Sequence, residues 1–116
     1  METGKKIGLD LPSYPRYKVA AIQYNPSLFG IKKNIEEQLT MVEKAAINDA
    51  KLIVLVEMAT AGYCFYSRED IAPYVEAIPG PTTERFGKIA AKYGCYIVIG
   101  LPEVDTSTNI YYNSMF

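Results

Sequence analysis

Five consecutive apolar residues, Leu52 to Val56, run directly into a carboxylate at Glu57. An unbroken run of β-branched and leucine residues is typical of a strand that is covered on both faces, as in the middle of a parallel sheet. Ligands of open α/β folds gather outside the carboxyl ends of such strands. A carboxylate held away from water is costly unless it is paired or used in chemistry. The run therefore predicts an α/β fold and makes Glu57 the first candidate for a functional residue.

Size and charge limit the class of protein. The chain has 116 residues, of which 49% are hydrophobic and 22% are charged, as in one ordinary globular domain. A net charge of −1 gives no electrostatic footprint for nucleic acid or an anionic membrane. No apolar run approaches the roughly 20 residues that span a bilayer. We therefore expect a cytoplasmic protein with no nucleic-acid or membrane partner.

Missing residue types narrow the chemistry. The chain contains no histidine, so it cannot form a Ser-His-Asp triad, a Cys-His pair or a histidine-ligated metal site by itself. Its two cysteines, Cys64 and Cys95, lie far apart in the sequence and do not make a zinc site. No glycine-rich phosphate loop is present. We expect no cofactor and no metal, which leaves carboxylates, lysines, tyrosines and thiols as candidate groups.

The first half of the chain predicts a βαβ unit. Tyr17 to Tyr24 has apolar side chains on both faces, which predicts a central strand. Gln23 within it is expected to be a buried amide bonded to the backbone, with a structural role near the site as the alternative. Asn34 to Ala50 is predicted to be a helix. Its apolar stripe consists of Ile35, Leu39, Val42 and Ala46.

The second half predicts two helices. Ser67 is expected to cap a short helix, with Asp70 three residues later. Thr82 or Thr83 is expected to cap the helix Glu84 to Tyr93, which Gly94 ends in a left-handed conformation.

Two further strands are predicted after these helices. Tyr96 to Leu101 should be buried on both faces, and Ile110 to Phe116 should pair with it as an antiparallel hairpin. The polar segment Pro102 to Thr108 between them is expected to be the turn.

The ends of the chain suggest how the domain is organised. Residues 1–16 have no clear period and are expected to form an N-terminal arm, so the domain starts near Tyr17. The sequence stops at Phe116, in the middle of an apolar strand. A terminus there leaves apolar surface and ladder groups unpaired. We therefore expect residues 17–116 to be the N-terminal part of a longer domain.

Glu57 suits general-base catalysis. Burial at the strand end would raise the pKa of its carboxyl group, and a positioned base contributes on the order of 10²–10⁴ in rate. Tyr63, Phe65 and Tyr66 are expected to form a dry wall beside it. The alternative is that Glu57 pairs with a Lys or Arg or caps a turn, because structural ion pairs also perturb carboxylates.

Several segments together resemble the nitrilase superfamily of carbon–nitrogen hydrolases. They are Tyr17 to Pro26, Ala50 to Glu57 with Gly62-Tyr63, Ile78 to Pro81, Tyr96 to Gly100 and Tyr112 to Ser114. The resemblance implies the N-terminal half of an α-β-β-α sandwich, in the order β-α-β-(short α)-α-β-β. It also implies that full-length members assemble as dimers or larger spirals, so a homo-oligomer is expected.

Members of this family cleave non-peptide C–N bonds in amides, nitriles and N-carbamoyl compounds with a Glu, a Lys and a Cys. The resemblance makes Glu57 the general base, places Tyr63 in the wall of the substrate pocket and gives Asn113 a supporting place at the site. The Lys and the Cys have no counterparts in these 116 residues. The fragment alone is therefore expected to be inactive.

Three residues depart from the family pattern or leave alternatives open. Val56 stands where the family has Pro, so the aim of Glu57 is less constrained. Cys95 is expected to be a packing residue, whereas a Cys64–Glu57 thiol–carboxylate pair is conceivable. A non-enzymatic α/β module that binds a ligand or partner at the strand ends is the alternative function.

Overall fold

The computed structural model describes residues 13–116, which form a mixed α/β fold. The elements follow in the order β1 (Lys18–Ala21), α1 (Ile31–Ile47), β2 (Ala50–Val54), α2 (Arg68–Ile71), the 3₁₀ turn η1 (Ala72–Tyr74), α3 (Pro81–Tyr93), β3 (Tyr96–Val98), β4 (Gly100–Asp105) and β5 (Ile110–Met115). This is the predicted order with one additional strand. Residues 1–12 of the expected N-terminal arm lie outside the described residues, and residues 13–16 are exposed without regular secondary structure.

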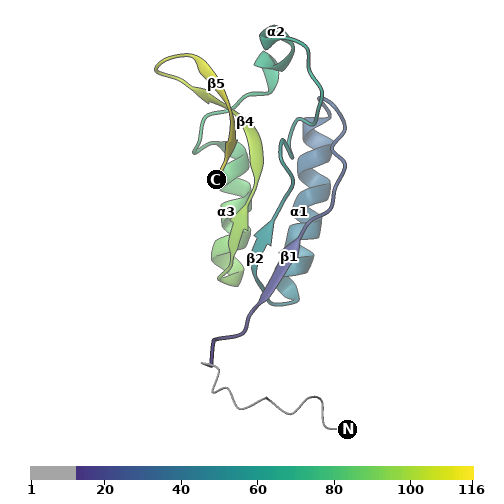
Figure 1. The fold of residues 1–116 in the computed structure, drawn as a ribbon, viewed down its shortest axis with the longest axis vertical. Helices are drawn as coiled ribbons and strands as arrows, with labels where there is room; N and C mark the ends of the chain where they lie inside the picture. Colours follow the sequence, from purple (N-terminus) through teal and green to yellow (C-terminus); the bar gives the residue numbers. More distant parts are fainter. Residues whose placement is uncertain (1–12) are drawn as a thin grey trace, which may run out of the picture.

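Three parallel strands form one sheet in the order β1-β2-β3. The register places Leu52 of β2 opposite Val19 of β1 and Tyr96 of β3. Figure 1 shows α1 and α3 side by side behind the strands, and both helices contact each other and the sheet. The βαβ unit is confirmed. In the described chain β1 lies at the edge of this sheet, so the predicted central position of the Tyr17–Tyr24 strand is wrong.

An apolar core lies between the two long helices and the sheet. Val42 of α1, Ile53 of β2 and Phe86 of α3 are at most 1% exposed. The stripe predicted for α1 is buried at three positions, and its fourth residue, Leu39, is half-buried. Complete burial of side chains of this size contributes about 1.5–3 kcal/mol each. The helical periodicity therefore identified the core-facing side of α1 correctly.

Two of the three predicted helix-capping residues are confirmed, and the third is wrong. The Ser67 hydroxyl accepts the Asp70 amide N–H at 3.1 Å, and Gly94 ends α3 with φ 62°. The predicted threonine cap of α3 is wrong, because the helix starts earlier and its N-cap is Gly80. Thr83 lies within the first turn and its hydroxyl accepts the Gly80 amide N–H at 2.7 Å. Pro81 favours this earlier start, because a helix tolerates proline at its first position.

An antiparallel hairpin of β4 and β5 continues from the sheet. The predicted strand Tyr96–Leu101 is in fact two strands that separate at Ile99. β3 pairs with β2, whereas β4 pairs with β5. The backbone of Ile99 exchanges two hydrogen bonds with Phe116, at 3.1 and 3.2 Å. Pro102 belongs to β4 and not to the turn, which is consistent with the tolerance of proline in edge strands.

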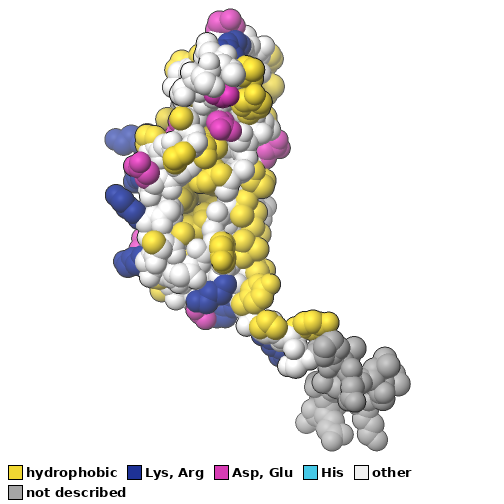
Figure 2. All heavy atoms as spheres, turned by 90° about the vertical axis from the view of Figure 1, so that its left-hand side faces the viewer, with side chains coloured by type: hydrophobic (Ala, Val, Ile, Leu, Met, Phe, Trp, Pro, Cys, Tyr) yellow, Lys and Arg dark blue, Asp and Glu magenta, His cyan; other side chains and the backbone are white. Residues whose placement is uncertain are grey.

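The second face of the three-stranded sheet is open in the described part of the chain. Val19 of β1 is 63% exposed and Tyr96 of β3 is 78% exposed. Gln23, predicted to be a buried amide, is also exposed. Figure 2 shows hydrophobic side chains along the edge of the molecule opposite most of the lysines and arginines. Burial on both faces is therefore wrong for β1 and β3, because residues 13–116 supply helices to one face alone.

Candidate functional site

A tight turn directly after β2 positions Glu57. Met58, the next residue, has φ 49° and its side chain is 1% exposed. A non-glycine residue with positive φ is uncommon and is retained where the surroundings hold it in place. The amide N–H of Gly62 donates to the carbonyl of Met58 at 2.8 Å, which closes the turn. The backbone that carries Glu57 is thus folded back on itself over residues 57–62.

Two buried amide side chains of α1 hold this turn. The Asn34 amide donates to the carbonyl of Thr60 at 2.9 Å, and the Gln38 amide donates to the carbonyl of Ala59 at 2.7 Å. Both side chains are 0% exposed. They satisfy carbonyl groups that would otherwise be buried without partners, which is costly. Asn34 and Gln38 are positioning residues for the Glu57 turn.

Gly100 lets β4 approach the backbone of Glu57 closely. The amide N–H of Ala59 donates to the carbonyl of Gly100 at 2.8 Å. A Cβ atom at Gly100 would lie 2.9 Å from the backbone nitrogen of Met58 and 3.0 Å from the Cα atom of Glu57. Side chains do not tolerate such distances to backbone atoms. The absence of a side chain at residue 100 is therefore required for the observed placement of Glu57.

Substituting Gly100 tests this close approach. Gly100→Ala is expected to lower the free energy of unfolding by roughly 1–3 kcal/mol, as overpacking does. Gly87→Ala is the matched control, because Gly87 lies inside α3 and a Cβ atom there meets nothing within 4 Å. That control is expected to stabilise the chain by about 0.5–1 kcal/mol through helix propensity. Urea unfolding of both variants measures the difference, and equal effects would contradict the close approach.

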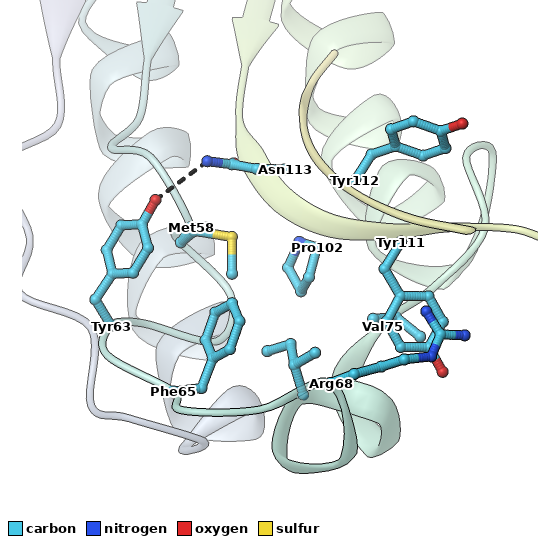
Figure 3. Close-up of a pocket in the computed structure, with 10 residues that line it drawn as sticks. Met58, Tyr63, Phe65, Arg68, Val75, Pro102, Tyr111, Tyr112 and Asn113 are labelled. Atoms are coloured by element: carbon cyan, nitrogen blue, oxygen red, sulfur yellow. Dashed lines mark hydrogen bonds between the residues drawn. The ribbon is translucent and has the colours of Figure 1, made fainter. Parts of the chain in front are cut away.

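The structure brings together the three residues that the sequence predicted for the site. The Asn113 amide donates to Oε1 of Glu57 at 2.5 Å and to the hydroxyl oxygen of Tyr63 at 3.1 Å. Glu57 follows β2, Tyr63 follows the turn, and Asn113 lies in β5. Figure 3 shows the Asn113 amide directed toward the Tyr63 hydroxyl. Three segments that are distant in sequence therefore converge on one carboxylate.

The electrostatic state of Glu57 differs from the prediction. Glu57 is exposed, and hydrogen bonding from Tyr63 and then from Asn113 holds the pKa of its carboxyl group below the ordinary value of 4.5. Hydrogen bonds to an ionised carboxylate favour the charged form. The predicted rise in the pKa by burial is therefore wrong for this chain. No ion pair involves Glu57 within residues 13–116, so the structural ion-pair alternative is not formed there.

The tyrosine contact gives a pH prediction. Tyr63→Phe removes the largest cause of the lowered pKa, so the pKa of Glu57 is expected to rise toward 4.5. Because the pKa is lowered in the folded chain, this contact stabilises the fold above pH 4.5 and is lost as the pH falls through the folded value. Carbon-13 NMR titration of the Glu57 carboxyl group measures the shift. Tyr66→Phe is the control, since Tyr66 is 94% exposed, and a similar shift in that variant would contradict the prediction.

An open cavity of about 250 Å³ lies beside Tyr63 and Asn113. Figure 3 shows these two residues on one side of the cavity and Arg68 with Tyr111 on the other. The rest of the lining is mostly apolar and consists of Met58, Phe65, Ile71, Val75, Pro102 and Tyr112. Phe65 thus belongs to the wall as predicted. Tyr66 does not line the cavity, which corrects its predicted place.

The cysteines occupy different environments. Cys95 is buried, which confirms its predicted packing role. Cys64 is exposed, and its thiol donates to the carbonyl of Phe65 at 3.6 Å. The hydrogen bonds of residues 13–116 include none between Cys64 and Glu57. The conceivable thiol–carboxylate pair is therefore not formed in this part of the chain.

Within residues 13–116, no three Cys, Asp or Glu side chains are grouped closely enough to hold a metal ion. None of the helices in the same range combines the length and the apolar character that crossing a membrane requires.

A comparison with protein families identifies the family to which this fold belongs. The family model described as "Carbon-nitrogen hydrolase" matches residues 18–116. The chain therefore belongs to the carbon–nitrogen hydrolase family, which confirms the resemblance drawn from the sequence.

Individual relatives agree with this assignment. The chain is 33% identical to the protein N-terminal amidase of Saccharomyces cerevisiae over 103 residues, and 36% identical to a nitrilase of Pyrococcus abyssi over 98 residues. Each alignment covers 84% of this chain, but 22% of the amidase and 37% of the nitrilase. A crystal structure of an N-terminal amidase superposes with a TM-score of 0.71 at 33% identity, over 82% of this chain and 23% of that one. The chain thus spans well under half the length of these relatives.

Sequence reasoning missed the residues that support Glu57. Asn34 and Gln38 are four residues apart and lie next to the apolar stripe of α1, so a polar pair on the buried side of the helix was the available signal. Arg68 carried no signal, because a single arginine in a short helix is usually a surface residue. Gly100 lies in a predicted strand, where an isolated glycine can mark a close backbone approach.

Proposed function

We propose that this chain supplies the general base and part of the substrate pocket of a hydrolase that cleaves non-peptide C–N bonds in small amides, nitriles or N-carbamoyl compounds. The observation that supports this most is the convergence of Tyr63 and Asn113 on the Glu57 carboxylate next to an apolar cavity. Glu57 is the catalytic residue in this proposal. Tyr63 and Asn113 bind the substrate and orient the carboxylate.

The reaction proposed for an amide has two halves. Glu57 takes the proton from a cysteine thiol, and the thiolate attacks the carbonyl carbon. A lysine ammonium stabilises the oxyanion, ammonia leaves with the proton from Glu57, and an acyl thioester remains. Glu57 then takes a proton from water, and the resulting attack releases the acid and restores the thiol. The lysine and the cysteine of this reaction have no counterparts among the 116 residues of this chain.

The open sheet face suggests how the site is completed. Tyr96 and Val19 expose apolar surface that a second β layer would cover in an α-β-β-α sandwich. Such a layer would also exclude water from Glu57 and raise the pKa of its carboxyl group toward that of a working base. We propose that residues 17–116 are the N-terminal part of this domain and that the complete protein is a cytoplasmic homo-oligomer.

Ammonia release tests the proposed function. The hydrolase that contains this chain is expected to release ammonia from simple amides, whereas the 116-residue chain alone is expected to release none. Ammonia release by the chain alone that depends on Cys64 would show that the exposed Cys64 thiol is the nucleophile. That result would overturn the proposal that the nucleophilic cysteine is missing from this chain. A non-enzymatic module predicts reversible ligand binding and no ammonia release from either protein.

A further inference from the structure

The side chain of Arg68 connects α2 to the end of the β4–β5 hairpin. Its guanidinium carbon lies 3.5 Å from the centroid of the Tyr111 ring, and one of its N–H groups donates to the carbonyl of Asn109 at 2.7 Å. Asn109 directly precedes β5, which contains Tyr111. Among the side-chain hydrogen bonds of residues 13–116, this is the one that joins residues 105–110 to another element. Arg68 therefore holds the end of the hairpin from outside it.

The Tyr111 ring is held from two directions. On one side it carries the Arg68 guanidinium group, which is attracted to the face of the ring. It also packs against a small apolar cluster that includes the buried side chains of Met58 and Ile71. Met58 directly follows Glu57, and Ile71 belongs to α2. The position of the ring is thus set by α2 and by the turn that carries the carboxylate.

Asn113 follows Tyr111 by two residues in β5. Side chains two residues apart in a strand point to the same face, and both of these side chains line the cavity. The Asn113 amide donates to Glu57 at 2.5 Å and to the Tyr63 hydroxyl oxygen at 3.1 Å. Figure 3 shows Arg68 beside Tyr111 and the Asn113 amide directed toward Tyr63. A displacement of the Tyr111 ring therefore also displaces the donor of both hydrogen bonds.

The same short helix restrains the loop that carries Tyr63. The Asp70 carboxylate of α2 accepts the backbone N–H of Tyr66 at 3.2 Å, which fixes this loop three residues after Tyr63. One hydrogen-bond partner of Glu57 is thus connected to α2 through the loop. The other is connected to α2 through the contacts of Arg68 with the hairpin.

We propose that Arg68 is a positioning residue for the hydrolysis: by holding Tyr111 and the end of the hairpin, it keeps the Asn113 amide in contact with Glu57. The inference rests on the proposed function, because the role of Arg68 is exerted on the proposed general base. A flat guanidinium fork can stack on a ring and donate to a carbonyl at the same time. An ammonium group is a point charge without a flat face, so lysine would replace these contacts in part.

Carbon-13 NMR titration of the Glu57 carboxyl group in the 116-residue chain tests the inference without requiring turnover. Tyr111→Leu removes the ring but no charge, and it is expected to raise the pKa of Glu57 because the Asn113 hydrogen bond weakens. Arg68→Gln is expected to raise the same pKa, and Arg68→Lys to restore part of the difference. Amide hydrogen exchange over residues 110–115 is expected to become about fivefold faster in Tyr111→Leu and Arg68→Gln, as the loss of one exposed cation–π contact predicts.

A double-mutant cycle distinguishes this route from a direct effect of the Arg68 charge. In a chain that already carries Asn113→Ala, Arg68→Gln is expected to cause no further rise in the pKa of Glu57, because the contact that it supports is absent. Lys88→Gln is the control for the loss of one positive charge, because Lys88 is exposed on α3, and it is expected to leave this pKa unchanged. An equal rise with and without Asn113, or no rise in Tyr111→Leu, would overturn the inference.

The pH–rate profile of the complete hydrolase tests the consequence for catalysis. A higher pKa of the general base moves the acid side of the profile to higher pH, which is expected for Arg68→Gln and in part for Arg68→Lys. An unmoved acid side in Arg68→Gln would overturn the positioning role. Failure of ammonia release by the unchanged complete enzyme would overturn the proposed function instead, and it would leave the shifts measured in the 116-residue chain as they are.

Discussion

Replacing Glu57 with glutamine in the complete hydrolase is expected to lower the rate of amide hydrolysis by on the order of 10²–10⁴, the usual contribution of a positioned general base. Glutamine retains an oxygen that can accept the Asn113 hydrogen bond, so the local geometry is conserved while the basic group is lost. The measurement is the rate of ammonia release at saturating substrate. The acid side of the pH–rate profile, which reports the ionisation of the base, is also expected to disappear.

A control variant distinguishes the loss of the catalytic base from the loss of one negative charge. Glu84 is exposed in the first turn of α3, and Glu84→Gln is expected to leave the rate unchanged. Circular dichroism checks that both variants fold. If Glu57→Gln keeps most of its activity while folding normally, the carboxylate is not the base and the proposed role is wrong.

Replacing Asn34 with alanine is expected to lower the free energy of unfolding by on the order of 3 kcal/mol, because one buried and two partly buried backbone groups lose their partner together. The Asn34 side chain accepts the amide N–H of Ser27 at 2.9 Å, and it donates to the carbonyls of Ser27 and Thr60 at 2.8 and 2.9 Å. These contacts join the segment after β1 to the turn after Glu57. Faster amide hydrogen exchange over residues 59–62 is therefore expected as well.

Asn25→Ala is the control for this variant. Asn25 is also an asparagine near the end of β1, but its side chain is exposed. Its replacement is expected to change the unfolding free energy by less than about 0.5 kcal/mol. Urea unfolding measures both variants, and similar losses would show that the buried Asn34 contacts do not hold the turn.

Much of the secondary structure was predictable because its signals are local. The apolar stripe of α1 follows the 3.6-residue period, and a serine cap and a left-handed glycine depend on a few neighbouring residues. The hairpin was predictable because the segment between its strands is too short for a crossover. The break at Ile99 was not, because its one local signal is Gly100, and a glycine inside an apolar run does not tell whether the strand changes its partner. The backbone changes partner there from β2 to β5.

The candidate site was predictable in part. The family resemblance named Glu57, Tyr63 and Asn113, and the structure brings them within hydrogen-bonding contact. The sequence did not predict that Glu57 would be exposed with a lowered pKa, because both properties depend on what surrounds the carboxylate. The supporting residues Gln38 and Gly100 contact the Glu57 turn across long sequence separations, which periodicity does not register.

The sequence by itself determined the order of the elements up to β3, the core-facing side of α1 and the place of a carboxylate after the central strand. These features follow from side-chain periodicity and turn chemistry, which act over a few residues. Only the tertiary structure decided that Asn113 reaches Glu57, that Arg68 lies across an apolar cavity, and that one face of the sheet stays open in residues 13–116. The physical reason is that contact and burial are properties of pairs of surfaces, and the two surfaces come from distant parts of the chain.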